Sequence, residues 1–175
     1  MRTASLTLLA LVVLTTSLLA EEAPQITLVD LRPLSGWKGD PVGNVAITTD
    51  EGKHLQLTTT RTAQQPKASI SGLVGWVDCS KDGKPGGFHM VDGVPIGSRL
   101  VLRNPNGTIL TITAEKPIIE QWGFDRDGVH IILKSRALHG PAVIELFTIN
   151  DGSKAGTYPG YGSTGSAWAQ SFLDH

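Results

Sequence analysis

The chain has almost no cysteine: Cys79 is the single one among 175 residues. One cysteine cannot form an internal disulfide, so packing must hold the domain together, even in an oxidising compartment. A reactive thiolate needs a cationic neighbour that lowers its pKa, and only Lys81 stands near Cys79 in the sequence. We therefore expect Cys79 to be a small buried hydrophobic residue.

The chain also lacks an excess of either charge. It carries 15 Lys and Arg against 16 Asp and Glu, and the basic residues form no cluster. Nucleic-acid binding depends on phosphate neutralisation by Lys and Arg, and attachment to anionic membranes depends on the same residues. We therefore expect no nucleic-acid partner and no electrostatic attachment to a membrane.

Long hydrophobic runs are absent except at the N-terminus. Arg2 precedes an uncharged apolar segment, residues 6–19, and an acidic pair follows Ala20. This order is typical of a secretory signal peptide, and the run is short for a membrane span, which takes about 20 residues. We predict a signal peptide over residues 1–20 and a single secreted or periplasmic domain over residues 21–175, with an uncleaved N-terminal anchor as the alternative.

A helical period is missing as well: no 3.6-residue pattern persists for three turns after the N-terminal run. Short hydrophobic runs instead alternate with turn sequences such as Asn104–Gly107 (NPNG) and Asp125–Gly128 (DRDG). Glycine adopts positive φ without steric cost, and Asn and Asp side chains cap the turn. We therefore predict an all-β fold of antiparallel meander sheets.

The hydrophobic runs set the expected strands. We predict strands over residues 26–31, 43–49, 53–59, 98–103, 108–113, 129–133 and 142–149. Residues 68–77 are also apolar but contain Gly72 and Gly75, which in a strand mark a bulge or a close approach of two backbones.

Four segments lack a clear strand pattern. Residues 61–67 are polar and contain Pro66, and residues 134–141 are a polar connection, so both are expected to be loops. Residues 157–166 are rich in Gly, Tyr and Ser and are expected to be irregular. Residues 167–173 can form a short helix or a strand.

An internal spacing of 45–46 residues runs through the chain. Trp76, Trp122 and Trp168 follow one another at steps of 46 residues. Two pairs of turns keep a step of 45, namely 82–83 with 127–128 and 106–107 with 151–152. A period of about 40–45 residues with several short strands is that of a β-propeller blade. We predict blade-like units near residues 68–113 and 117–156, with Trp76 and Trp122 at equivalent core positions.

The second unit resembles a known family. Residues 122–135 read W-x-F-x-x-D-G-x-x-I-x-L-x-S, followed by G-P-x-x-I at residues 140–144 and D-G at residues 151–152. This pattern is similar to the WD40-like blade of TolB-type β-propellers, closely over residues 117–156 and loosely over residues 75–113. Arg126 stands where that blade usually has proline.

The resemblance implies a propeller-like arrangement that cannot close within one chain. A closed propeller typically takes four to eight blades. At this period, residues 21–175 hold about three. The units are therefore expected either to stack as a compact β-sandwich or to form a larger assembly with other subunits.

The densest polar cluster offers the residue types of a nucleophile, a base and an acid: Ser135, His139 and Glu145. No Gly-x-Ser-x-Gly elbow surrounds Ser135, and no oxyanion hole is evident. We therefore predict no catalytic residues and expect Ser135 and His139 to satisfy backbone groups. An envelope hydrolase that uses these three residues is the alternative.

Metal binding is not expected either. A calcium loop of the EF-hand type that starts at Asp125 needs Gly at position 130 and Glu at position 136, where this chain has His130 and Arg136. The five histidines, His54, His89, His130, His139 and His175, lie without metal-ligand spacing. We predict neither a metal nor a cofactor.

The residues most suited to ligand binding are Arg136, His139, Tyr158 and Tyr161. Arg136 can anchor an anionic group, and tyrosines in a Gly-rich segment can stack on sugars or peptides. We predict a non-catalytic binding or protein-interaction module whose partner is a protein, a peptide or a glycan. A subunit of an oligomeric propeller-like assembly is a further alternative.

Overall fold

The computed structural model describes residues 22–32, 40–49, 51–81, 87–91, 94–160 and 167–173. The predicted signal peptide (1–20), the expected turn at 82–83 and Tyr161 lie outside the described residues. Within the described ranges, no helix is both long enough and apolar enough to cross a membrane.

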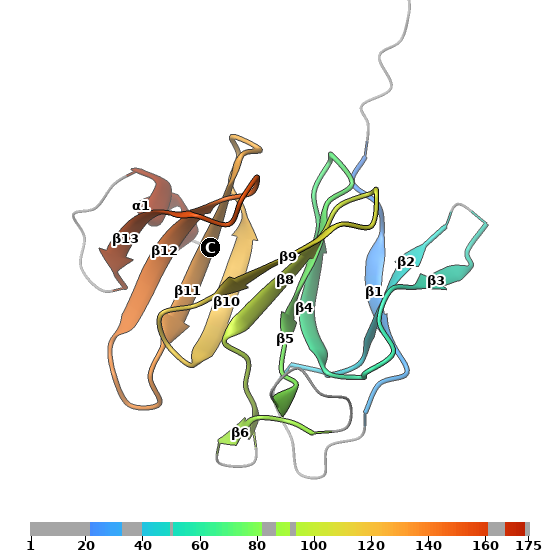
Figure 1. Ribbon diagram of the computed structural model, residues 1–175, viewed down its shortest axis with the longest axis horizontal. Helices are drawn as coiled ribbons and strands as arrows, with labels where there is room; N and C mark the ends of the chain where they lie inside the picture. The colour runs from blue at the N-terminus through green and yellow to red at the C-terminus, as the bar shows by residue number, and fades with distance from the viewer. Residues whose placement is uncertain are drawn as a thin grey trace, which may run out of the picture.

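Three antiparallel sheets stand side by side, the first at the right of Figure 1 and the last at the left. The first has the order β1-β2-β3, with bounds Ile26–Val29, Asn44–Thr48 and His54–Gln56. The middle sheet has the order β4-β5-β8-β9, with bounds Ala63–Ala68, Val74–Asp78, Arg99–Arg103 and Ile109–Thr113. The last has the order β10-β11-β12-β13, with bounds Ile118–Phe124, His130–Arg136, Ala142–Thr148 and Lys154–Pro159.

Two smaller elements complete the described fold. A ribbon of β6 (Met90–Val91) and β7 (Val94–Pro95) lies between β5 and β8, and the helix α1 (Ala167–Leu173) follows β13. All sheets are antiparallel and none closes into a barrel, so the predicted all-β meander is confirmed. The predicted turns also form: Gly107, Gly128 and Gly152 have φ of 89°, 71° and 71°.

Three expected loops are strands. Residues 63–68 form β4, an edge strand in which Pro66 is tolerated because the register shifts between Gln64 and Lys67. Residues 134–136 continue β11, and residues 157–159 belong to β13, where pairing with β12 overrides the Gly- and Tyr-rich composition. The ambiguous segment 167–173 is a helix.

The spacing of the tryptophans does not mark equivalent positions. Trp76 lies on the second strand of the middle sheet, Trp122 on the first strand of the last sheet, and Trp168 on α1. The turns at Asn106-Gly107 and Asp151-Gly152 are equivalent, because each joins the third strand of its sheet to the fourth. The structural units therefore span residues 63–113 and 118–159.

The main core lies between the middle and last sheets. Trp122 is fully buried at its centre, with side chains from both sheets around it: Val77, Leu100, Leu102, Ile112, Ile131, Leu133 and Phe147. Gly75 makes this contact possible, since a Cβ there would lie 2.5 Å from Trp122 Cη2 and 2.8 Å from Leu102 Cδ2. The close approach at Gly75 is therefore made by the side chains of Trp122 and Leu102, whereas the sequence analysis expected a bulge or a second backbone.

The opposite face of the middle sheet is covered less completely. The first sheet packs on β4 and β5 through a small cluster of buried residues, Val45, Ala63, Val74 and Trp76. Gly43 and Ala63 exchange two backbone hydrogen bonds of 3.0 Å, which join the two sheets at one end. On this face of β9, the side chains of Ile109, Thr111 and Thr113 remain exposed.

The helix α1 covers the outer face of the last sheet. Ala169 is buried against Ile132 and Ile144, and Tyr158 and Phe172 pack around them. In the two preceding interfaces a sheet packs on a sheet, whereas here a helix takes that place (Figure 1). A ring in which another sheet stacks on this face therefore requires α1 to move away.

Candidate binding groove

Two of the three hydrolase candidates meet, but inside the protein. Ser135 Oγ donates to Glu145 Oε2 over 3.2 Å, and both residues are 0% exposed. The same carboxylate oxygen accepts the backbone N–H of Glu115 at 2.9 Å, and Ser135 Oγ accepts that of Lys116 at 3.4 Å. Ser135 therefore satisfies backbone groups, as predicted, and a substrate has no access to its hydroxyl. His139 is exposed in the turn between β11 and β12.

The buried carboxylate of Glu145 has one cationic partner. Lys154 Nζ lies 2.6 Å from Glu145 Oε1 and 3.7 Å from Glu115 Oε2. Hydrogen bonding to Glu145 is the main cause that raises the pKa of Lys154, and the nearby Glu115 raises it further. This ion pair closes the rim of the main core, since Lys154 is partly exposed while Glu145 is not.

Three of the four predicted binding residues, Arg136, His139 and Tyr158, lie in the described part of the chain, at the last sheet. Arg136 forms an ion pair with Glu120 and donates to the carbonyl of Leu138 over 3.2 Å. Tyr158 is on the same outer face of the sheet, packed among apolar residues beneath α1. Arg136 and Tyr158 therefore take part in intramolecular contacts. Their role in ligand binding, like that of His139, stays a prediction.

The β10–β11 turn gathers a cluster that the sequence analysis did not assemble. Asp125, Asp127 and His130 place one ligand atom each within 4.8 Å of the others. Asp127 Oδ1 accepts the N–H groups of Val129 (2.9 Å) and His130 (3.0 Å), and Asp127 Oδ2 contacts His130 Nδ1. The bond with His130, more than the backbone bonds, lowers the pKa of Asp127. All these contacts cap the turn.

Cys79 behaves as expected. The residue is fully buried, and its thiol donates to Gln64 Oε1 over 3.1 Å. Burial, helped by the charges of Asp78 and Asp40, raises the pKa of Cys79 to about 12. The thiol is therefore protonated and inert at neutral pH.

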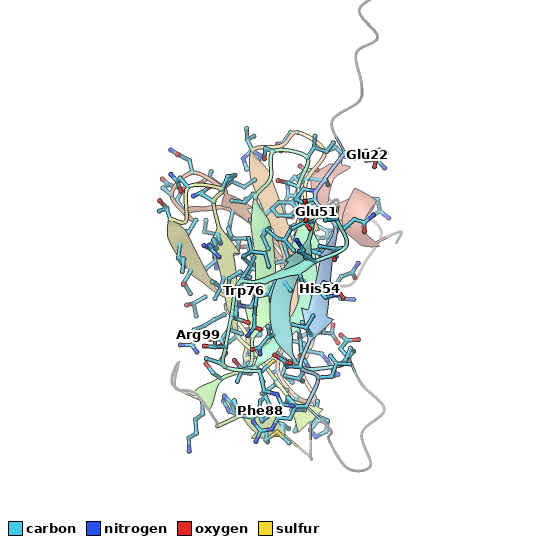
Figure 2. All side chains as sticks on the ribbon, turned by 90° about the vertical axis from the view of Figure 1, so that its right-hand side faces the viewer. Glu22, Glu51, His54, Trp76, Phe88 and Arg99 are labelled. Carbon is cyan, nitrogen blue, oxygen red and sulfur yellow. The ribbon has the colours of Figure 1, made fainter. Side chains whose placement is uncertain are left out.

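A groove of about 460 Å³ opens where the first sheet stops short of covering the middle one. Trp76 and Val101 lie along it, residues 57–60 form one wall, and Arg103 and Ile109 border the other side. Figure 2 looks onto this side of the molecule, with Trp76 near the middle and Arg99 toward the lower left. Its volume falls within the range of about 300–1,000 Å³ that is usual for ligand sites.

Strand register explains the order of side chains in the groove. Trp76 pairs with Val101, and Val101 pairs with Thr111, so these three form a row across β5, β8 and β9. The next row toward the β8–β9 turn contains Arg103 and Ile109. Alternation along each strand places these side chains on the face opposite to the main core.

The two ends of the groove differ in charge. At one end Asp78 accepts from Arg99 Nη2 (2.6 Å), Ser80 N (2.9 Å), Ser80 Oγ (2.8 Å) and Thr62 Oγ1 (3.1 Å), which fixes the ion pair in place. At the other end, no carboxylate of a described residue lies within 4.0 Å of the guanidinium of Arg103. This end therefore presents an uncompensated positive charge.

A second hollow, of about 540 Å³, lies between the β4–β5 and β10–β11 turns, with Ile70, Phe124 and Ile149 among its lining residues. Turn residues border it, whereas strand residues held by ladder hydrogen bonds make up much of the Trp76 groove. Sites on strands hold their geometry better than sites on loops. We therefore regard the Trp76 groove as the better candidate site.

The sequence analysis expected Trp76 in the core and did not single out Arg103. The expectation for Trp76 follows from the local sequence pattern, and the residue is indeed only 6% exposed. Arg103 has no local pattern that marks it. The missed signal is the alternation on β8, where Arg99, Val101 and Arg103 share a face with the uncharged polar and apolar residues of β9. Comparison of the chain with protein-family models, with curated proteins and with solved structures finds no match.

Proposed function

We propose that this chain is a non-catalytic binding module that acts outside the cytoplasm, and that the Trp76 groove is its ligand site. The N-terminal signal-like segment is the sequence feature that supports the location. The buried position of Ser135 supports a role without catalysis by the Ser135, His139 and Glu145 set.

The observation that carries the proposal is the open half of the middle sheet beside residues 57–60. An apolar floor with a fixed ion pair at one end and a free guanidinium at the other favours an elongated ligand. Such a ligand carries an anionic group for Arg103 and apolar surface for Val101 and Ile109. Guanidinium groups bind carboxylates and phosphates through paired hydrogen bonds, which gives such a contact direction as well as strength.

The test is a binding screen with charge-reversed variants. A display library of random linear peptides and a glycan array are probed with the wild-type protein, with Arg103→Glu and with Arg126→Glu. Arg126 is an exposed arginine of the β10–β11 turn, so its reversal changes the net charge equally but leaves the groove intact.

We expect ligands of the wild type to bind Arg103→Glu at least tenfold more weakly, about 1.4 kcal/mol, and to bind Arg126→Glu as before. Ligands that bind Arg103→Glu as well as the wild type contradict the groove as the site. Turnover of a model ester that disappears in Ser135→Ala contradicts the non-catalytic role.

A further inference from the structure

We infer that the partner is an extended peptide that adds to the middle sheet as a new strand along β9, with an acidic side chain over Arg103. The inference rests on the proposed function, since it names the ligand class of the same groove. It is carried by the free edge of β9 and by the charge beside it.

The hydrogen-bond phase of the β8–β9 hairpin identifies the free backbone groups. Asn104 N donates to Thr108 O (2.9 Å), and Ala114 N donates to Ser98 O (2.8 Å). In an antiparallel pair, hydrogen-bonded and non-hydrogen-bonded residue pairs alternate. The backbone groups of Leu110 and Ile112 therefore point toward β8. Those of Ile109, Thr111 and Thr113 point away from β8 into the open edge.

The edge strand β4 of the middle sheet and the edge strand β10 of the last sheet are bonded to each other, whereas β9 is a free edge. Trp122 Nε1 donates to Gln65 O (3.0 Å), Gln65 Nε2 donates to Glu120 O (3.1 Å), and Lys67 Nζ donates to Trp122 O. These bonds tie β4 to β10 through side chains. Natural proteins protect sheet edges in this way or with charges, prolines and bulges.

The edge strand β9 has none of these protections among its residues. Its sequence, Ile109–Thr113 (ILTIT), is free of charge, proline and glycine, and its register with β8 shows no bulge. Ile109 is 60% exposed. Such an edge is a template for strand addition, in which main-chain bonds supply affinity and alternate side chains supply specificity.

The positive charge of Arg103, beside the β9 edge, favours a peptide that carries an acidic side chain. Ile109 pairs with Arg103, so an added strand places one residue in the same row, two strand spacings or about 9.6 Å from Arg103. The side chains of an arginine and of a glutamate or aspartate together span such a gap. An acidic residue opposite Ile109 is therefore favoured, and apolar or Thr-like residues are favoured opposite Thr111 and Thr113.

The test uses proline to remove one edge donor. Thr111→Pro deletes an N–H that faces the open edge and leaves the β8–β9 ladder bonds, so the sheet remains intact. Thr111→Val is the matched control, because it keeps the N–H and removes only the hydroxyl. The probes are peptides selected from a library of random 12-residue linear sequences on the wild-type protein and then made synthetically.

We expect the selected peptides to contain an enriched Asp or Glu, to bind Thr111→Val within about twofold, and to lose at least tenfold in affinity on Thr111→Pro. Far-UV circular dichroism and thermal unfolding check that the proline variant folds. A second measurement needs no variant: N-methylation of each peptide backbone position in turn should abolish binding to the wild type with a period of two residues.

Several outcomes overturn the inference and separate it from the proposed function. A flat N-methyl scan, or equal binding to Thr111→Pro, excludes strand addition, while the proposed function stands if Arg103→Glu still loses the ligand. If the screens yield glycan ligands and no peptides, strand addition is likewise excluded, and the proposed function stands if Arg103→Glu loses those glycans. A wild-type dimer that Thr111→Pro converts to a monomer in light scattering assigns the edge to a second copy of this chain instead of a peptide.

Discussion

The two faces of the middle sheet are covered to different extents by their neighbours. On one face, side chains from three strands of the last sheet, β10, β11 and β12, bury Leu100, Leu102 and Ile112. On the other, the three short strands of the first sheet pack on β4 and β5, and Val101 and Ile109 border an open groove. The same strands, β8 and β9, contribute to a sealed core on one side and to a candidate site on the other.

This difference shows how a stack of sheets can leave one face of a sheet open as a candidate binding surface. The sheet that carries the groove is held rigid by the core behind it, so the open face needs no packing of its own. The closed interface is then expected to determine stability, and the open one is available for the proposed ligand. Each of the following predictions tests that division.

The largest effect is expected for Trp122→Ala. Trp122 is 0% exposed and lies between two rigid sheets, so the cavity cannot collapse, and we expect a loss of about 3–5 kcal/mol in the free energy of unfolding. Trp76→Ala should cost less, about 1–3 kcal/mol, because water can enter its site from the groove. Urea unfolding measures both. Equal costs would remove the distinction between the two interfaces.

The next largest loss of stability is expected for Gly75→Ala. The added Cβ meets the Trp122 ring and Leu102 at less than 3.0 Å, so the sheets must shift, at a cost of about 1–3 kcal/mol. Gly87→Ala is the control, because among the described residues its Cβ meets only Lys81 Cβ at 3.4 Å, an ordinary contact. Thermal unfolding of the two variants checks this. A control as unstable as Gly75→Ala would show that loss of glycine alone is responsible.

The smallest effect on stability is expected from the Lys154–Glu145 ion pair at alkaline pH. The ion pair with Glu145 raises the pKa of Lys154 above 10.5, so its contribution to stability is complete below pH 10.5 and is lost as the pH rises through the folded-state pKa. Lys154→Arg keeps the charge throughout this range and should lose less stability between about pH 9 and about pH 12. Unfolding midpoints across this range give the difference. Parallel curves would contradict the role assigned to the pair.

Much of the fold is predictable from local sequence. The turns at residues 104–107, 125–128 and 151–152 form where Asn, Asp and Gly indicate them, because turn geometry depends on a few neighbouring residues. The strand β4 was not predictable, since Pro66 reads as a loop and only its position at an edge, beside a register shift, permits a strand. The resemblance to TolB-type blades stays a prediction.

The candidate site was less predictable than the fold. Arg103 carries no local signal, and Trp76 has the pattern of a core residue. The groove exists because β3, some fifty residues earlier in the chain than β9, is short and leaves β8 and β9 uncovered.

The sequence by itself determined the strand-rich class, the hairpin turns and the burial of Cys79. Each of these follows from the steric and hydrogen-bonding preferences of residues close together in the chain. Only the tertiary structure decided which tryptophan is sealed, which serine is unreachable and which arginine faces solvent. Those outcomes depend on how far one sheet extends over another, and this coverage is set by strands that are distant in the sequence.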